Sequence, residues 1–181
     1  MERTPVPEAN LVDTEVGKKP EGDGWFVVNT GEAAAMGISD DLYGMVFEAE
    51  FGSFPHFGIN VRVLGPGKPA AMYHAESAQE AFLVLQGEAR LIVENEERPL
   101  RQWDFVHCPP HTAHVVVGAG DRSCVVLMVG ARNVGTDLVF PASEAAAEYG
   151  ASVEEDTNDR RVAYAGWSAP AARKFPWPPP N

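Results

Sequence analysis

The sequence predicts an all-β domain, built as a sandwich or barrel of short strands. Runs rich in β-branched and other apolar residues recur at intervals of about ten residues, which is the spacing typical of such folds. These runs cover residues 59–64, 81–85, 89–93, 104–108, 114–118 and 124–130. Turn-forming groups separate them, among them Gly-Pro-Gly-Lys-Pro at 65–69 and the pair Pro109-Pro110. No long helical period interrupts this region.

The segments around these runs differ in composition. Residues 1–23 are rich in Pro, Gly, Glu and Lys, so we expect a mobile or loosely packed arm. The barrel is expected to cover residues 24–140, with its core motifs at 60–129. A short strand is expected at 24–30, whereas residues 31–58 show only a weak pattern of apolar and polar residues. Residues 141–181 are expected to form a helical extension and a proline-rich tail.

Within this extension, the alanine-rich segment 141–151 predicts a short helix that Pro141 opens and Gly150 closes. A second short helix is expected at 159–164. The tail from Lys174 to Asn181 carries four prolines and should be extended, wrapping the barrel or a neighbouring subunit.

Composition excludes several classes of protein. A chain of 181 residues suits one domain with a sizeable core. The net charge of −12 argues against nucleic acid and against an anionic membrane surface as partners. No window is long and apolar enough to span a bilayer, and the first residues lack the plan of a signal peptide. With only two cysteines, Cys108 and Cys124, we expect reduced thiols and a cytoplasmic location.

Three charged or titratable residues directly precede the buried run at 81–85. They are His74, Glu76 and Glu80, and isolated charges of this kind are costly to bury without a partner. In extended backbone His74 and Glu76 share one face, and Glu80 lies in register with the apolar positions of its own strand. His114 begins a later strand, so its imidazole is expected to meet these groups.

Two histidines with one or two glutamates form a good site for a first-row divalent metal ion. The set has no thiolate, so a structural zinc site of the cysteine type is not indicated. The alternative for His74 and His114 is that they are ordinary polar residues at the barrel mouth. The alternative for Glu76 is that it orients a ligand imidazole without binding the metal itself.

The same residues resemble the two sequence motifs of the cupin superfamily. In the first motif, Gly-x5-His-x-His-x3/4-Glu-x6-Gly, the matching residues are His74, Glu80 and Gly87, and Glu76 stands where the second His is usual. Gly67 lies one residue further from His74 than the pattern asks.

The segment 103–118 resembles the second motif, Gly-x5-Pro-x-Gly-x2-His-x3-Asn, through Pro109 and His114. Trp103 and His111 occupy its two glycine positions, and Gly118 occupies the Asn position.

This resemblance implies a double-stranded β-helix, the small jelly-roll barrel of cupins, with one metal ion near its mouth and a homodimeric assembly. It implies that His74, Glu80 and His114 are ligands. If Glu76 also binds, the set is two histidines and two carboxylates; if it turns away, the set is a two-His-one-carboxylate triad with open positions. The ion is Fe, Mn, Ni or Zn, and the sequence does not choose among them.

The functional hypothesis is a metal-dependent enzyme that acts on a small molecule. A dioxygenase or other oxidoreductase comes first, an isomerase second, and a decarboxylase is also compatible; Glu76 would be the fourth ligand or a general base. The alternatives are a non-catalytic module that binds a small ligand and a metal-free structural barrel. A structural barrel would fill its interior with Phe82, Phe105 and Met128.

Overall fold

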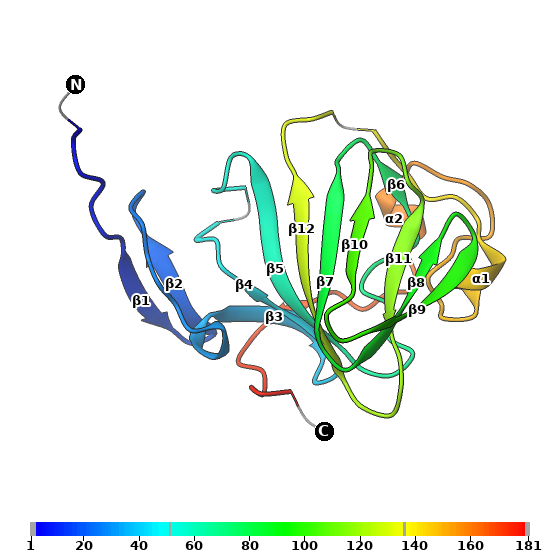
Figure 1. Ribbon diagram of the computed structural model, residues 1–181, viewed down its shortest axis with the longest axis horizontal. Coiled ribbons are helices and arrows are strands. Elements are labelled where there is room, and N and C mark those ends of the chain that lie inside the picture. The colour runs from blue at the N-terminus through cyan, green and yellow to red at the C-terminus, as the bar shows by residue number, and fades with distance from the viewer. Residues whose placement is uncertain (1–2, 51, 136, 180–181) are drawn as a thin grey trace.

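Figure 1 shows the computed structural model, which describes residues 3–50, 52–135 and 137–179. The fold is all-β, as predicted, and the named strands pair in antiparallel fashion. The strands are β1 (Asn10–Thr14), β2 (Gly17–Glu21), β3 (Ala34–Ser39), β4 (Leu42–Val46), β5 (Phe57–Leu64), β6 (Ala75–Glu76), β7 (Glu80–Gln86), β8 (Glu88–Val93), β9 (Glu96–Arg101), β10 (Phe105–Cys108), β11 (His114–Gly118), β12 (Cys124–Ala131), β13 (Leu138–Val139) and β14 (Ala171–Ala172).

Two sheets form the barrel. The larger has the order β10-β7-β12-β5-β4-β3-β14, and the smaller has the order β11-β8-β9. The segment before β6 extends the smaller sheet, because Ala70 N–H donates to the Val116 carbonyl at 2.8 Å and further backbone bonds follow at His74. Side chains from both sheets meet in one buried cluster, which includes Leu42, Leu64, Phe82, Val84, Ala89, Leu91, Cys108, Val116, Cys124 and Val126.

The six predicted strands are confirmed as β5, β7, β8, β10, β11 and β12. The weakly patterned segment 31–58 supplies β3 and β4, which extend the larger sheet next to β5. The strand expected at 24–30 is wrong: Trp25 forms only an isolated bridge with Glu8, and Asn29 caps a 3-10 helix at Thr30–Glu32. Val27 is 76% exposed, whereas Val28 packs against the buried cluster of Tyr43, Val61 and Val63 without pairing to the sheet.

The N-terminal arm contains a regular hairpin of β1 and β2, which the sequence pattern did not indicate. Figure 1 shows it projecting from the end of the molecule that lies opposite β8 and β9. The hairpin turns at Gly17, whose φ of 122° favours glycine, and the Thr14 hydroxyl donates to the Gly17 carbonyl at 2.5 Å.

The C-terminal extension has two single-turn helices, α1 (Glu144–Ala147) and α2 (Arg160–Ala163). The first does not open at Pro141: Ser143 is its N-cap, and the Ser143 hydroxyl accepts the Ala146 N–H at 3.1 Å. Ala146 belongs to a buried cluster on the outer face of the smaller sheet. Among the described residues, neither helix approaches the length and apolar character that a membrane span needs.

The tail wraps the barrel, as expected. The ring of Phe175 stacks on Tyr43 with centroids 4.6 Å apart, and the Tyr43 hydroxyl donates to the Pro176 carbonyl at 2.5 Å. Tyr43 lies in a buried cluster with Val61 and Val63. The outer face of β4 and β5 is therefore apolar and covered, which leaves the inner face of these strands to line the barrel.

Candidate metal centre

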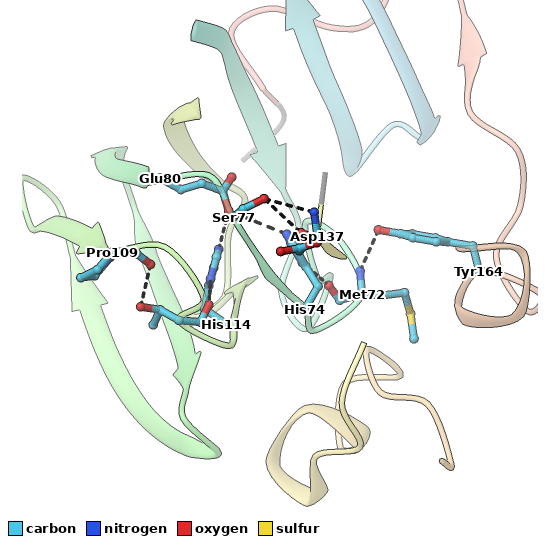
Figure 2. Close-up of polar contacts among 9 residues, drawn as sticks. Met72, His74, Ser77, Glu80, Pro109, His114, Asp137 and Tyr164 are labelled. Carbon is cyan, nitrogen blue, oxygen red and sulfur yellow. Dashed lines mark hydrogen bonds and ion pairs between the residues drawn. The ribbon is translucent and has the colours of Figure 1, made fainter. Parts of the chain in front are cut away.

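The structure brings three of the predicted ligands together. One donor atom from each of His74, Glu80 and His114 lies within 4.8 Å of the other two. Glu80 begins β7 and His114 begins β11. His74 forms an antiparallel bridge with His114, with backbone N···O distances of 3.2 and 2.9 Å, so their imidazoles lie side by side. Figure 2 shows both rings close to the Glu80 carboxylate.

Backbone carbonyls orient both imidazoles. Nδ1 of His74 lies 2.7 Å from the Met72 carbonyl oxygen, and Nδ1 of His114 lies 2.9 Å from that of Thr112. Because a carbonyl only accepts, each Nδ1 carries the hydrogen and donates it. In the neutral imidazole each Nε2 is then the atom with a free lone pair, as in metal-ligating histidines whose other nitrogen is held by a hydrogen bond.

The Glu80 carboxylate completes the set. Its Oε2 lies 3.0 Å from Nε2 of His114 and 3.8 Å from Nε2 of His74. Oε2 is buried, and no described residue gives it a contact with hydrogen-bond geometry, despite the short distance to His114. Metal–ligand bonds of about 2.1 Å place neighbouring ligand atoms roughly 3.0–3.5 Å apart. The distance to His114 lies in this range and the distance to His74 slightly exceeds it, so the donor set fits one first-row divalent ion after a small side-chain shift.

The pKa values of the two imidazoles shift in opposite directions in this environment. Burial, reinforced by the neighbouring His114, lowers the pKa of His74. Burial acts in the same direction on His114, but contacts with Cys108 and Glu80 outweigh it and raise the pKa of His114. Two adjacent rings repel each other when both are charged. The proton therefore goes to His114, the ring nearer to Glu80. The Glu80 carboxylate thus attracts positive charge to the point where the three donor atoms converge.

Glu76 lies beside this group and is not part of it. It belongs to β6 and lines the same cavity, but it is absent from the set of described residues whose ligand atoms converge. Burial, and then the charge of Glu80, raise the pKa of Glu76. The Glu76 carbonyl accepts the His111 N–H at 2.7 Å, which ties the turn before β11 to β6. Its role as a fourth ligand stays a prediction.

The three converging residues and Glu76 border a cavity of about 820 Å³. This volume is in the range of small-molecule sites. Phe82 and Met128 line it, whereas Phe105 is 66% exposed and does not fill the interior as the structural-barrel alternative requires. Phe105 pairs with Leu83 in the register of β10 and β7, where side chains point away from the cavity-lining Phe82.

Other histidines lie outside the site. Within the described residues, neither His56 nor His107 lines the cavity, and both are exposed. His111 is exposed, and its φ of 67° is in the left-handed region. Trp103 has a φ of 76°. The two positions where the second cupin motif has glycine therefore keep a glycine-type backbone conformation.

Asn60 and Arg62 on β5 are among the cavity residues that sequence reasoning missed. The signal was present in the alternation of INVRVL, which places these two polar residues on one face of the strand. That alternation alone does not reveal whether the polar face turns toward solvent or toward the barrel interior.

Comparison with known proteins agrees with this architecture. Residues 60–130 match the cupin domain family model. No curated protein matches the chain. A candidate sugar phosphate isomerase from Acidithiobacillus ferrooxidans is 30% identical, with 54% of this chain and 63% of that chain covered and a TM-score of 0.46. The chain thus spans less than two thirds of that protein.

Two further solved structures are more distant in sequence. A sugar phosphate isomerase from Silicibacter pomeroyi is 22% identical, with 55% of this chain and 70% of that chain covered and a TM-score of 0.46. A predicted oxalate decarboxylase from Thermotoga maritima is 17% identical, with 58% of this chain and 97% of that chain covered and a TM-score of 0.52. The Thermotoga maritima structure supports the fold alone. The segment from β5 to β12 thus matches a cupin domain and lies within the antiparallel barrel.

Proposed function

We propose that the protein is a metal-dependent enzyme that acts on a small molecule, with His74, Glu80 and His114 as ligands of one divalent transition metal ion. The observation that carries the proposal is the convergence of their three donor atoms at the wall of a cavity of ligand size. Two histidines and one carboxylate form the donor set of non-haem iron oxygenases, which favours a dioxygenase. A decarboxylase and an isomerase use the same kind of open site and come next.

Each residue has a definite task in this proposal. The carbonyls of Met72 and Thr112 hold the two imidazoles with Nε2 toward the cavity, so little reorganisation accompanies binding. A bound ion supplies Lewis acidity, or oxygen chemistry if it is redox-active. Glu76, beside the ligands and on the cavity wall, is positioned to accept a proton from a bound molecule.

A non-catalytic module that binds a small ligand is the second candidate, because the same cavity serves either purpose. The metal-free structural barrel has less support, since the exposed Phe105 does not fill the interior. A homodimer and a cytoplasmic location remain predictions. Size-exclusion chromatography with light scattering tests the first, and fractionation of the source cells tests the second.

Elemental analysis of purified, tag-free protein tests the metal centre. We expect one equivalent of Fe, Mn, Ni or Zn in the wild type and its loss in His74→Ala and His114→Ala. His107→Ala removes an exposed imidazole outside the cavity and should keep the full metal content. Equal metal content in wild type and His114→Ala would contradict the ligand assignment. No metal after anaerobic reconstitution with each ion would favour the metal-free candidates.

A further inference from the structure

Arg62 lies in the middle of β5 and lines the same cavity as the three ligands. In the register of the larger sheet it is opposite Gly44 on β4 and Val126 on β12. A Cβ atom at Gly44 would lie 3.0 Å from Cδ of Arg62, which is tighter than ordinary packing. The glycine therefore leaves room on the inner face of the sheet for the long Arg62 side chain.

Arg62 has no acidic partner among the described residues. No hydrogen bond or ion pair joins its guanidinium to another described side chain, whereas several other arginines pair with carboxylates: Arg90, Arg98, Arg132, Arg161 and Arg173. Arg62 is only partly exposed, and burial lowers its pKa. A guanidinium stays protonated in proteins, so the barrel holds a poorly solvated positive charge.

Such a charge is costly unless something compensates it. The chain has 26 acidic residues against 14 lysines and arginines, so acidic partners are abundant elsewhere in the sequence. The lack of one at Arg62 leaves its planar N–H donors free for a ligand. Carboxylate and phosphate groups match this fork of donors with two parallel hydrogen bonds.

Asn60 adds a second unsatisfied group on the same face of β5. Its side-chain Oδ1 is buried and accepts no hydrogen bond from a described residue, and Asn60 also lines the cavity. Buried acceptors are rarely left without a donor. A ligand hydroxyl or amine beside the anionic group would satisfy this atom.

Arg62 lines one cavity together with the three converging residues. On the His74 side of that cavity the Met72 N–H donates to the Tyr164 hydroxyl at 3.2 Å, and the Met72 carbonyl holds Nδ1 of His74 (Figure 2). The cavity of about 820 Å³ is a space that one bound small molecule can share between Arg62 and the ligand atoms.

We propose that Arg62, assisted by Asn60, binds an oxyanion group of the substrate, a carboxylate or a phosphate, and so directs the rest of that molecule toward the metal ligands. Only the second part of this proposal, the direction of the bound molecule toward the metal ligands, rests on the proposed function. The anion site itself depends on Arg62 and not on a bound ion.

The test measures binding of two probes, inorganic phosphate and malonate, to metal-free full-length protein by isothermal titration calorimetry at low ionic strength. We expect saturable binding of at least one probe to the wild type. Arg62→Met should weaken it at least tenfold, and Arg62→Lys should retain part of it. Arg98→Met is the matched control, because both Met variants change the net charge by one unit and Arg98 is exposed on β9. It should bind within twofold of the wild type.

A thermal melt separates a binding role from a structural one. Arg62→Met should melt at or above the wild-type temperature, because it removes an uncompensated charge. Unchanged probe binding in Arg62→Met, or no saturable binding of either probe to the wild type, would overturn the proposal. Binding of phosphate alone assigns a phosphate-bearing substrate, and binding of malonate alone assigns a carboxylate.

The same titration with His114→Ala keeps this proposal distinct from the metal centre. If the variant loses its metal and still binds the probe, both assignments stand. If the wild type carries no metal but Arg62-dependent binding persists, only the metal centre fails.

Discussion

Glu48 and Arg132 form a buried ion pair whose loss should be costly. Glu48 is 5% exposed, and its carboxylate accepts from Nη1 and Nη2 of Arg132 at 2.6 and 2.7 Å. The Phe54 N–H donates to the same carboxylate at 2.8 Å. The pair joins the segment after β4 to the end of β12, and both residues line the cavity. Glu48→Gln keeps the shape of the side chain and removes its charge.

The expected cost is about 3 kcal/mol in the free energy of unfolding. Removing one partner of a buried pair typically costs about 3–5 kcal/mol, since it leaves the other charge uncompensated. The Arg132 side chain is 19% exposed and recovers some hydration, which favours the lower end of that range. For a chain of this size such a loss lowers the melting temperature by roughly 6–12 °C.

Urea denaturation at pH 7 measures this cost, provided that the m-values of the two proteins agree. Glu32→Gln is the control, because the pair of Lys18 with Glu32 is exposed, at 33% and 56% of the two side chains. That variant should lose less than about 1 kcal/mol. If Glu48→Gln costs no more than Glu32→Gln, the buried pair does not stabilise the barrel and the reasoning fails.

The pH dependence gives an independent check. Burial alone would raise the pKa of Glu48, but the hydrogen bonds from Arg132 and Phe54 outweigh it and hold the pKa below its ordinary 4.5. A carboxyl with a depressed folded-state pKa contributes stability above its unfolded pKa and loses it as pH falls through the folded value. The difference between wild type and Glu48→Gln should therefore be constant above about pH 5 and shrink as the pH falls below 4.5. A difference that persists undiminished in acid would contradict the assignment.

Two smaller changes test the tail and the second motif. Tyr43→Phe removes the hydrogen bond to the Pro176 carbonyl, so it should lower the free energy of unfolding by about 1 kcal/mol and speed tryptic cleavage of the tail. Faster cleavage with an unchanged free energy of unfolding would mean that this bond holds the tail in place without stabilising the barrel. Since burial, and then Asp40, raise the pKa of Tyr43 to about 12, this contact should be unaffected between pH 7 and 10. His111→Gly should leave stability unchanged or raise it by up to about 1 kcal/mol, because His111 has a φ of 67°; a clear loss in a thermal melt would show that the imidazole itself contributes.

Much of the fold followed from local pattern. Short apolar runs that end at Gly or Pro predicted six strands, because strand length and turn chemistry depend on neighbouring residues. The spacing of His74 and Glu80, with His114 at the start of a later strand, predicted three residues that the structure brings together. The strand at 24–30 was wrong because, beyond the isolated bridge of Trp25 with Glu8, its described residues pair with no neighbouring strand.

The tertiary structure alone decided which face of each strand turns inward. Alternation placed Asn60 and Arg62 on one face of β5 and Val61 and Val63 on the other, but it did not say which face meets the cavity. The tail covers the valine face, on which Val61 and Val63 pack beside Tyr43 and Met45 of β4, so the polar face lines the barrel. Phe105 differs in the opposite way: it is an aromatic residue, but its pairing with Leu83 in the register of β10 and β7 directs its side chain outward. The sequence by itself thus determined six strands of the barrel and the three residues that converge, while long-range pairing decided the cavity and placed a positive charge on its wall.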